Sequence, residues 1–303
     1  MISQAEGLAK NFNLNYNFIK TKIIFPWTKL KPGILPIFSW IFLNEINITP
    51  KPDIIISCGR KSVYLSVYFK KKYKNIINIH IQDPKINFKN FNYIVAPKHD
   101  NISGYNVINS IGAIHKFDKN EFTNLLDKEY QIPKKNLVSI IIGGSNNHYK
   151  FSTKEFHKLI LKIKEIINFN SKKNFLILTS RRSTKEMINL LKNELKNLAI
   201  IYNEKEKNPY TFALKNSEFF IVTSDSTSMI SECAFTGKPL YVFHLPYKRK
   251  SRRIENFHNQ FNSLNITKEL NNKNELVHWN YEILNESKRI SSIIKKRIIK
   301  ENS

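Results

Sequence analysis

Short apolar, β-branched runs alternate with helical patterns along this chain, and that alternation constrains the fold more than any other feature. Strands are expected at residues 21–25, 53–57, 76–81, 92–96, 137–142, 174–179, 198–202, 218–223 and 239–243. Helical patterns lie between most of them, near residues 60–72, 153–168, 184–196, 209–216, 226–236 and 252–264. Continuous apolar strands separated by helices are typical of parallel sheets covered on both faces. The sequence therefore predicts an α/β protein.

The length of 303 residues predicts two domains, because single hydrophobic cores stop growing near about 250 residues. The polar, proline-containing stretch DKEYQIPKKN at 127–136 is the expected linker. We expect a Rossmann-like, doubly wound domain over 1–130 and a second one over 135–282. Residues 283–303 are expected to form a basic amphipathic helix that carries isoleucines on one face: Ile290, Ile293, Ile294 and Ile298.

The net charge of +25 comes mainly from lysines that occur in every segment, which indicates a general bias toward Lys, Asn and Ile. No recognition module or aromatic–basic stacking motif accompanies the charge, so nucleic-acid binding is not expected. Such a surface would still attract anionic partners, including phospholipid head groups. The apolar stretch GILPIFSWIFL at 33–43 is too short to span a bilayer. The favoured prediction for this stretch is a buried helix, and the alternative is a patch that docks onto a membrane.

Arginines are rare in this chain and unevenly placed. Only eight of the 49 basic residues are arginines, and five of those eight lie between residues 181 and 253. A planar guanidinium suits bidentate binding of phosphate, so the clustering favours an anion site, with surface ion pairs as the alternative. The two cysteines, Cys58 and Cys233, match no metal-ligand spacing and indicate reduced thiols in a cytoplasmic protein.

A glycine doublet follows the apolar run that ends at Ile142, in a chain with only 8 glycines. The segment 143–151 is long for a connection between a strand and a helix, and ligands of such sheets bind where the strands end. The next helix is expected to begin after Ser152, with Glu155 completing a capping box. Backbone amides of this loop could cradle a diphosphate, and a structural turn is the alternative. The predicted phosphate-facing residues of this loop are Gly143, Gly144, Ser145 and His148.

A second strand end carries the sequence LTSRRSTKEM at 178–187. Ser183 and Glu186 predict another capping box, which places Ser180, Arg181 and Arg182 at a helix N-terminus. Two cations at that end oppose the helix dipole, at a cost of about 0.3–1 kcal/mol each. A bound anion would reverse that cost, while side chains extended into solvent are the alternative.

The third strand end lies within VTSDSTSMISECAFTGKPLYVF at 222–243, where a buried strand is followed by a helix that ends at Gly237. Asp225 or Ser226 is the expected N-cap of this helix. Hydroxyls and free amides at the positive end of a helix favour phosphate. The predicted nucleotide-binding residues here are Ser224, Asp225, Ser226, Ser228 and Glu232, the last as an acceptor for ribose hydroxyls.

These segments resemble the elongated-mitochondria, or mitochondrial fission, protein family of bacteria and plants. Further segments match that family's motifs in order: CGRKS at 58–62, IQDPKINFKNFNYIVAPKHD at 81–100, NVINSIGAIHKF at 106–117, GGSNNHYKF at 143–151 and RRIENFH at 252–258. The same segments are similar to the donor half of two-domain, B-type glycosyltransferases. One such enzyme adds N-acetylglucosamine to the peptidoglycan lipid precursor.

The resemblance implies two Rossmann-like domains that face each other across a cleft. A nucleotide sugar would lie against the second domain, with Gly143, Gly144 and Ser145 near its phosphates and Glu232 on its ribose. The C-terminal helix would cross back to the first domain. Plant members of the family are linked to organelle division rather than to sugar transfer.

The acceptor side of such a protein would lie on the first domain and include Gln4, Gly59 and Arg60. Family members have a strand and a loop before the segment that matches QAEGLA at 4–9, so the first domain is expected to be shortened at its start. The available groups for a catalytic base are Asp83, His99 and Asp100, at strand ends of this domain.

The favoured hypothesis is a glycosyltransferase that uses a nucleotide-diphosphate sugar as co-substrate and no other cofactor. No Asp-x-Asp pair or histidine cluster occurs, so no metal site is expected. A lipid-linked or membrane-associated acceptor would suit the basic surface, with the protein peripheral on the inner face of the membrane. The alternative is a non-catalytic adaptor or scaffold on the same fold.

Overall fold

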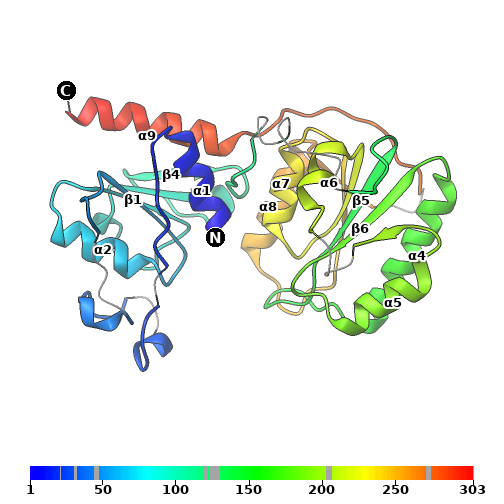
Figure 1. Cartoon of the computed structure of the whole chain (residues 1–303), viewed down its shortest axis with the longest axis horizontal. Coiled ribbons are helices and arrows are strands. Elements are labelled where there is room, and N and C mark those ends of the chain that lie inside the picture. The colour runs from blue at the N-terminus through cyan, green and yellow to red at the C-terminus, as the bar shows by residue number, and fades with distance from the viewer. Residues whose placement is uncertain are drawn as a thin grey trace. The chain divides into compact units, whose positions relative to one another are not determined.

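The computed structural model describes residues 1–20, 22–30, 33–43, 48–118, 122, 130–202, 207–270 and 274–302 (Figure 1). The chain divides into two compact units. The first combines Met1–Lys116 with Asn285–Ser303, and the second is Phe117–Leu284. The division therefore falls near residue 116 rather than near residue 130, and part of the predicted linker, 127–129, lies outside the described residues.

The first unit contains a parallel sheet of four strands in the order in which the chain makes them. These strands are β1 (Ile54–Cys58), β2 (Ile77–Ile81), β3 (Tyr93–Pro97) and β4 (Val107–Ser110). Helix α2 (Val63–Lys72) joins β1 to β2, while only 3-10 turns, Phe88–Asn90 and Lys98–Asp100, lie between the later strands. Sequence patterns missed β4, because its sequence VINS is short and places an exposed asparagine among buried residues.

Both faces of this sheet are covered, one of them by the two ends of the chain. Helices α1 (Ile2–Asn11) and α9 (Glu286–Asn302) lie side by side over it (Figure 1). On α9, Ile290 and Ile294 are fully buried in a cluster with Leu8 and the sheet residues Ile79 and Val95. This face of α9 is therefore a core surface, as its isoleucine spacing predicts.

Hydrogen bonds fix the start of α9 to the loop after β4. The backbone N–H of Ile111 donates to Glu286 Oε2 at 2.7 Å, and Ser287 Oγ donates to the carbonyl oxygen of His115 at 2.7 Å. The Glu286 and Ser287 side chains are buried there. The helix is thus attached to the first unit by polar contacts at its beginning and by apolar packing along its length.

Two predicted elements are absent from the described part of the first unit. Instead of a strand at 21–25, Ile23 forms one isolated antiparallel bridge with Phe42. Instead of a buried helix at 33–43, the chain makes a single 3-10 turn at Ser39–Ile41 and leaves several large side chains exposed. Prolines contribute to both differences: Pro26, directly after the predicted strand, is the N-cap of a 3-10 turn at Trp27–Lys29, and Pro36 lacks the N–H that a helix interior needs.

The second unit contains a parallel sheet of six strands in the order β10-β9-β8-β5-β6-β7. Its strands are β5 (Leu137–Ile142), β6 (Asn174–Thr179), β7 (Ile200–Ile201), β8 (Phe219–Thr223), β9 (Leu240–Phe243) and β10 (Thr267–Glu269). Its helices are α4 (Thr153–Phe169), α5 (Lys185–Leu195), α6 (Tyr210–Asn216), α7 (Thr227–Ala234) and α8 (Arg252–Ser263). All six residues of β5 are buried, as expected of a central parallel strand.

The strand order of this sheet reverses once. The chain adds β6 and β7 on one side of β5, then returns to place β8 on the other side of it. In open α/β sheets, ligands bind at such a reversal, outside the carboxyl ends of the two strands. The loops that follow β5 and β8 are therefore the candidate ligand site of this sheet.

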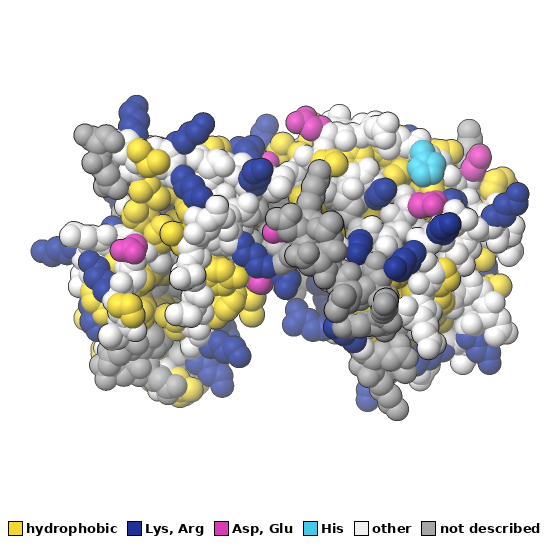
Figure 2. Space-filling model, turned by 45° about the horizontal axis from the view of Figure 1, so that its top comes forward, with side chains coloured by type: hydrophobic (Ala, Val, Ile, Leu, Met, Phe, Trp, Pro, Cys, Tyr) yellow, Lys and Arg dark blue, Asp and Glu magenta, His cyan; other side chains and the backbone are white. Residues whose placement is uncertain are grey.

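Two parallel sheets with helices confirm the predicted α/β fold class. Among the described residues, no helix is long and apolar enough to cross a membrane, and no group of three metal-binding side chains occurs. Neither Cys58 nor Cys233 forms a disulfide. Lysine and arginine side chains are spread over the visible face of both units (Figure 2), as the even distribution of lysine in the sequence predicts.

Candidate functional site

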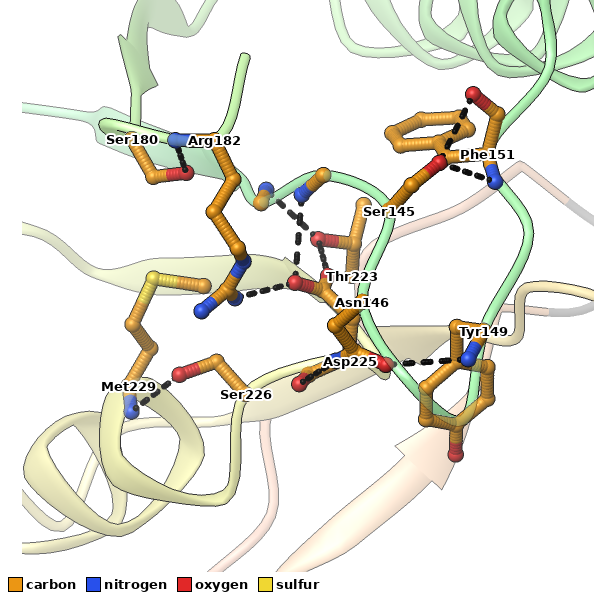
Figure 3. Close-up of polar contacts among 12 residues, drawn as sticks. Ser145, Asn146, Tyr149, Phe151, Ser180, Arg182, Thr223, Asp225, Ser226 and Met229 are labelled. Atoms are coloured by element: carbon orange, nitrogen blue, oxygen red, sulfur yellow. Dashed lines mark hydrogen bonds and ion pairs between the residues drawn. The ribbon is translucent and has the colours of Figure 1, made fainter. Parts of the chain in front are cut away.

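A buried carboxylate lies at the strand reversal of the second unit. Asp225, two residues after β8, has a side chain with 0% exposure. Its Oδ1 accepts a hydrogen bond from Thr223 Oγ1 at 2.6 Å, and its Oδ2 accepts one from the backbone N–H of Gly144 at 3.1 Å. The guanidinium of Arg182 forms an ion pair with the same Oδ2 (Figure 3). Asp225 thus joins the loops that follow β5, β6 and β8.

The glycine doublet is required by this arrangement. A Cβ on Gly143 would lie 2.0 Å from Asp225 Oδ2, and a Cβ on Gly144 would lie 2.3 Å from the carbonyl oxygen of Arg182. The N–H of Gly143 donates to Thr223 Oγ1 at 2.8 Å, so both glycine amides have protein acceptors. The prediction that these two amides cradle a diphosphate is therefore corrected: their glycines permit the close approach of Asp225 and Arg182.

The rest of the loop after β5 is held by its own side chains. Asn146 Oδ1 accepts hydrogen bonds from the N–H groups of His148 and Tyr149, at 2.8 and 2.9 Å. The Asn146 amide group donates to the carbonyl oxygen of Asp225 at 3.0 Å. Ser145 Oγ accepts from the N–H of Phe151 at 2.9 Å (Figure 3). The predicted phosphate ligands Ser145 and His148 therefore lie in a loop whose shape is set from within.

The loop after β6 differs from the prediction in its cap. The side chain of Thr184 caps α5 by accepting from the N–H of Met187, whereas Ser183 Oγ donates to the carbonyl oxygen of Gly143 at 2.8 Å. Ser183 is thus a link between two loops rather than part of a capping box. The box predicted at Ser152 is also absent, because the Ser152 side chain makes no cap hydrogen bond to α4.

The two arginines of this loop have different environments. Arg181 is exposed, whereas Arg182 is about half-exposed and anchored on Asp225. A guanidinium has five N–H donors, and the contact with Asp225 Oδ2 comes from one terminal nitrogen, Nη2. In Figure 3, the free side of the Arg182 guanidinium is directed toward Ser226 and Met229, in the first turn of α7. The loop therefore presents cationic donors beside a helix N-terminus.

The start of α7 retains binding capacity. Ser226 is the N-cap, and its Oγ accepts from the N–H of Met229 at 3.4 Å. Within the described residues, the N–H groups of Thr227 and Ser228 have no acceptor. Unsatisfied amides at the positive end of a helix are a common binding site for anions. Ser224, by contrast, is engaged, since its Oγ accepts from the N–H of Leu245 at 3.0 Å.

Glu232 lies further along α7, where the sequence predicts a ribose-binding carboxylate. Its Oε2 accepts a hydrogen bond from the hydroxyl of Tyr210, on α6, at 2.6 Å. Burial, followed by the charge of Glu232, raises the pKa of Tyr210 well above its usual value, so the phenol stays protonated and donates. Tyr210 therefore orients the Glu232 carboxylate.

A polar pocket of about 350 Å³ lies at the carboxyl ends of β9 and β10, alongside α8. It is lined by Val242, His244, Tyr247, Glu255, His258, Asn259, Asn262, Thr267, Lys268 and Glu269. His258 connects this pocket to the strand reversal, because its Nε2 lies 3.1 Å from both the Ser224 carbonyl oxygen and the Tyr149 hydroxyl. Sequence reasoning missed the pocket, since its residues are dispersed over 28 positions and belong to no compact motif.

Burial favours the neutral form of both pocket histidines. Burial, followed by the charge of His244, lowers the pKa of His258 to about 4. Burial also lowers the pKa of His244, opposed by the charge of Glu269. A His258 Nε2 without a hydrogen would direct its lone pair at the Ser224 carbonyl oxygen, so the tautomer with hydrogen on Nε2 fits these contacts.

The residues predicted for the acceptor side gather at the carboxyl end of the first sheet. Gln4 Oε1 accepts hydrogen bonds from Cys58 Sγ at 3.2 Å and from Gln82 Nε2 at 3.0 Å, across the ends of β1 and β2. Gly59 has a positive φ of 83°, and Arg60, next to it, is exposed. Gln4 is therefore largely occupied in tying α1 to the sheet.

The three groups predicted for catalysis occupy two neighbouring strand ends. Asp83 follows β2, where its carboxylate accepts from the N–H of Lys85 at 2.9 Å and pairs with the Lys85 ammonium group. His99 and Asp100 follow β3, with His99 Nε2 3.7 Å from Asp100 Oδ1 and His99 buried. Asp83 is therefore the most accessible of the three, with 16% of its side chain exposed.

Nearly the whole sequence matches a known family. The sequence pattern of the family described as Mitochondrial fission ELM1 matches residues 1–298. The chain belongs to this family. The "Uncharacterized protein RP120" of Rickettsia prowazekii (strain Madrid E) is 28% identical to this chain, over 97% of this chain and 92% of that protein. The Mitochondrial fission protein ELM1 of Arabidopsis thaliana is 22% identical over 82% of this chain and 64% of the plant protein.

The fold of this ELM1-family chain also resembles a solved enzyme. The structure of UDP-GlcNAc 2-epimerase from Methanocaldococcus jannaschii superposes with a TM-score of 0.52 and 16% identity, over 81% of this chain and 77% of that one. The shared feature is the GT-B-like fold, with two parallel α/β sheets. The family match over residues 1–298, and not the shared fold, confirms the resemblance of the sequence to the mitochondrial fission family.

Proposed function

We propose that this chain is a glycosyltransferase whose second unit binds the diphosphate of a nucleotide sugar at the N-terminus of α7. One observation carries the proposal. At the strand reversal, Asp225 fixes Arg182 beside a helix N-terminus at which the N–H groups of Thr227 and Ser228, within the described chain, have no acceptor. This combination matches the chemistry that a leaving diphosphate needs.

The charge balance favours a ligand here. Asp225 and Arg182 neutralise each other, so their pair adds rigidity rather than net charge. The positive end of α7 and the exposed Arg181 then supply the attraction for a phosphate. Because Arg182 is held in place before the ligand arrives, little side-chain entropy would be lost when its remaining donors bind oxygen.

Glu232 would bind the ribose in this proposal. A carboxylate oxygen has two lone pairs, so Glu232 can accept from a ribose hydroxyl while Tyr210 holds its orientation. The M. jannaschii enzyme that shares this fold is named for UDP-GlcNAc, which makes uridine diphosphate the first nucleotide to test. The acceptor would be bound by the first unit, with Asp83 as our candidate for the base.

A second candidate function is an adaptor that binds no nucleotide. The observation in its favour is that Asp225 already satisfies the amide of Gly144, the hydroxyl of Thr223 and one end of Arg182. A cluster that is complete without a ligand would be stable as a purely structural element. The two candidates differ in whether a nucleoside diphosphate binds at all.

Calorimetric titration of the folded protein with the diphosphates of uridine, guanosine, adenosine and thymidine distinguishes the glycosyltransferase from the adaptor. We expect one nucleotide to bind, and Arg181→Ala and Glu232→Gln each to weaken it roughly 10-fold or more. Lys192→Ala removes an exposed cation at the far end of α5 and should leave affinity unchanged. Absence of binding by all four nucleotides would favour the adaptor.

A further inference from the structure

The part of the first unit that precedes β1 exposes large apolar side chains. Six residues between positions 18 and 43 are at least half exposed: Phe18 57%, Phe25 71%, Ile34 66%, Phe38 55%, Trp40 53% and Leu43 57%. We call these six residues the apolar surface. Scattered apolar side chains are normal on a protein, but so many in one short segment indicate a surface that is covered in use.

Buried neighbours hold this surface outward. Ile41 and Phe42 are buried, with 0% and 6% exposure, although Trp40 and Leu43 on either side of them are exposed. The rings of Trp27 and Trp40 lie edge to face with centroids 5.1 Å apart, and those of Phe38 and Trp40 stack at 5.9 Å. The segment therefore uses some apolar residues for packing and presents the adjacent ones to solvent in a defined arrangement.

The charges of this segment all have one sign. No aspartate or glutamate occurs between Glu6 and Glu45, whereas five lysines do: Lys10, Lys20, Lys22, Lys29 and Lys31. The ammonium group of Lys29 lies 5.3 Å from the centre of the exposed Phe25 ring. On the face drawn in Figure 2, hydrophobic side chains form patches on the first unit with lysine and arginine side chains around them. Cationic and aromatic groups are therefore combined in one segment.

We propose that the apolar surface docks onto the surface of a lipid bilayer that contains anionic phospholipids. Phe and Trp side chains favour the boundary between head groups and acyl chains, and lysines beside them are attracted to anionic head groups. A protein partner is less favoured, because interfaces between proteins are depleted in lysine and here every charge has the same sign. The docking is peripheral, since the described residues of this segment contain 3-10 turns at Trp27–Lys29 and Ser39–Ile41 and no helix that could span a bilayer.

Co-sedimentation with vesicles tests this proposal. The full chain should bind vesicles in which phosphatidylglycerol is roughly a third of the lipid, and bind phosphatidylcholine alone at least several-fold more weakly. The double variant Phe38→Ser with Trp40→Ser should lose at least 10-fold in affinity, because two rings no longer enter the interface. Tyr105→Ser is the matched control, since Tyr105 is 78% exposed on the same unit but outside the segment.

The two tryptophans of this segment provide a second readout. Their fluorescence should shift to shorter wavelength with anionic vesicles, and the shift should shrink in Trp40→Phe, which keeps an aromatic ring. Failure of the folded wild type to sediment with either vesicle would overturn the proposal. Equal binding of vesicles by the double variant and the wild type would also overturn it. So would a wild type that binds no vesicle but self-associates, if the double variant abolishes the self-association. Nucleotide titration is independent of all these results.

Discussion

At the residue scale, the molecule depends most on Asp225. Its carboxylate has 0% exposure and would be very costly to bury alone, yet it receives a hydroxyl, a backbone amide and a guanidinium. The hydroxyl belongs to Thr223 at the end of β8, whereas the amide of Gly144 and the guanidinium of Arg182 belong to the loops after β5 and β6. The carboxylate therefore fixes the positions of those two loops relative to the end of β8. A geometry held in this way needs little reorganisation when a ligand binds.

Removing the cation from this cluster should destabilise the second unit. Arg182→Ala leaves the Asp225 carboxylate buried without a counter-charge, and we expect a loss of about 1–3 kcal/mol in the free energy of unfolding. Adding Asp225→Asn to Arg182→Ala should restore part of the lost free energy of unfolding, because a neutral amide needs no cation. Urea unfolding of both single variants and the double variant measures the coupling. Arg181→Ala, exposed and adjacent, should change stability by less than about 0.5 kcal/mol.

The glycine doublet gives a second prediction at this scale. Gly143→Ala should lower stability by about 1–3 kcal/mol or more, because the new methyl group would overlap the Asp225 carboxylate. Gly104→Ala is the control, since its nearest contact would be a methyl group of Val107 at 3.2 Å instead of a buried carboxylate at 2.0 Å. Equal thermal midpoints for the two variants would contradict the close approach described for Asp225.

His258 predicts a dependence of stability on pH. Its pKa is about 4 in the folded state and about 6.5 in an unfolded chain, so the unfolded chain binds the proton more readily. The contribution of His258 to the free energy of unfolding is therefore complete above about pH 6.5 and is lost as the pH falls toward 4. Between about pH 7 and pH 5 the loss should be roughly 2 kcal/mol.

Chemical denaturation at several pH values checks this expectation with two variants. His258→Gln should flatten the pH dependence of the free energy of unfolding, because the titrating group is removed. His157→Gln, which replaces an exposed histidine on α4, should keep the wild-type slope. An unchanged slope in His258→Gln would show that other groups carry the effect.

Sequence reasoning predicted which residues gather at the strand reversal better than it predicted their roles. It placed Gly143, Arg182 and Asp225 at three strand ends of one sheet, which is where they are. It assigned the glycine amides to a ligand, because a sequence does not show that an acceptor 80 or so residues away already occupies them. Roles that depend on long-range contacts were therefore the part that failed.

At the element scale, long patterns were predictable and short or interrupted ones were not. The helices at 153–168 and 252–264 and the central strand at 137–142 follow from apolar periodicity, since burial on one or both faces imposes it. Strand β10, with the sequence TKE, has no apolar residue and exists because β9 offers it a partner. Residues 33–43 have the composition of a core helix, but Pro36 interrupts it and only a 3-10 turn forms at Ser39–Ile41.

Helix α9 supports a prediction of its own. Ile290→Ala should cost about 2–5 kcal/mol, because the side chain is fully buried against α1 and the sheet. Ile299→Ala is the control on the same helix, with 67% of the side chain exposed. Hydrogen exchange should show α1 and α9 losing protection together in Ile290→Ala, since the two helices pack on each other. Loss of protection confined to α9 would contradict this coupling.

At the scale of the whole molecule, the first unit is assembled from both ends of the chain, and the second unit lies within it in sequence. A chain that ends at residue 284 should therefore keep the second unit folded and lose the first. We expect its second unit to retain nucleotide affinity within about 3-fold, because α7 and the loops around Asp225 belong to it entirely. Limited proteolysis, with calorimetry of the resistant fragment, checks both expectations. Protection of the first unit in the shortened chain would contradict them.

The attachment of α9 to the first unit also sets an order of events during translation. Residues 286–302 are made after the whole of the second unit, yet they cover one face of the sheet that the first hundred or so residues form. A nascent chain, in which only α1 covers that face, therefore exposes part of the apolar face of the first sheet while the second unit is synthesised and folds. We expect chaperones that recognise such surfaces to bind this nascent chain until α9 emerges from the ribosome.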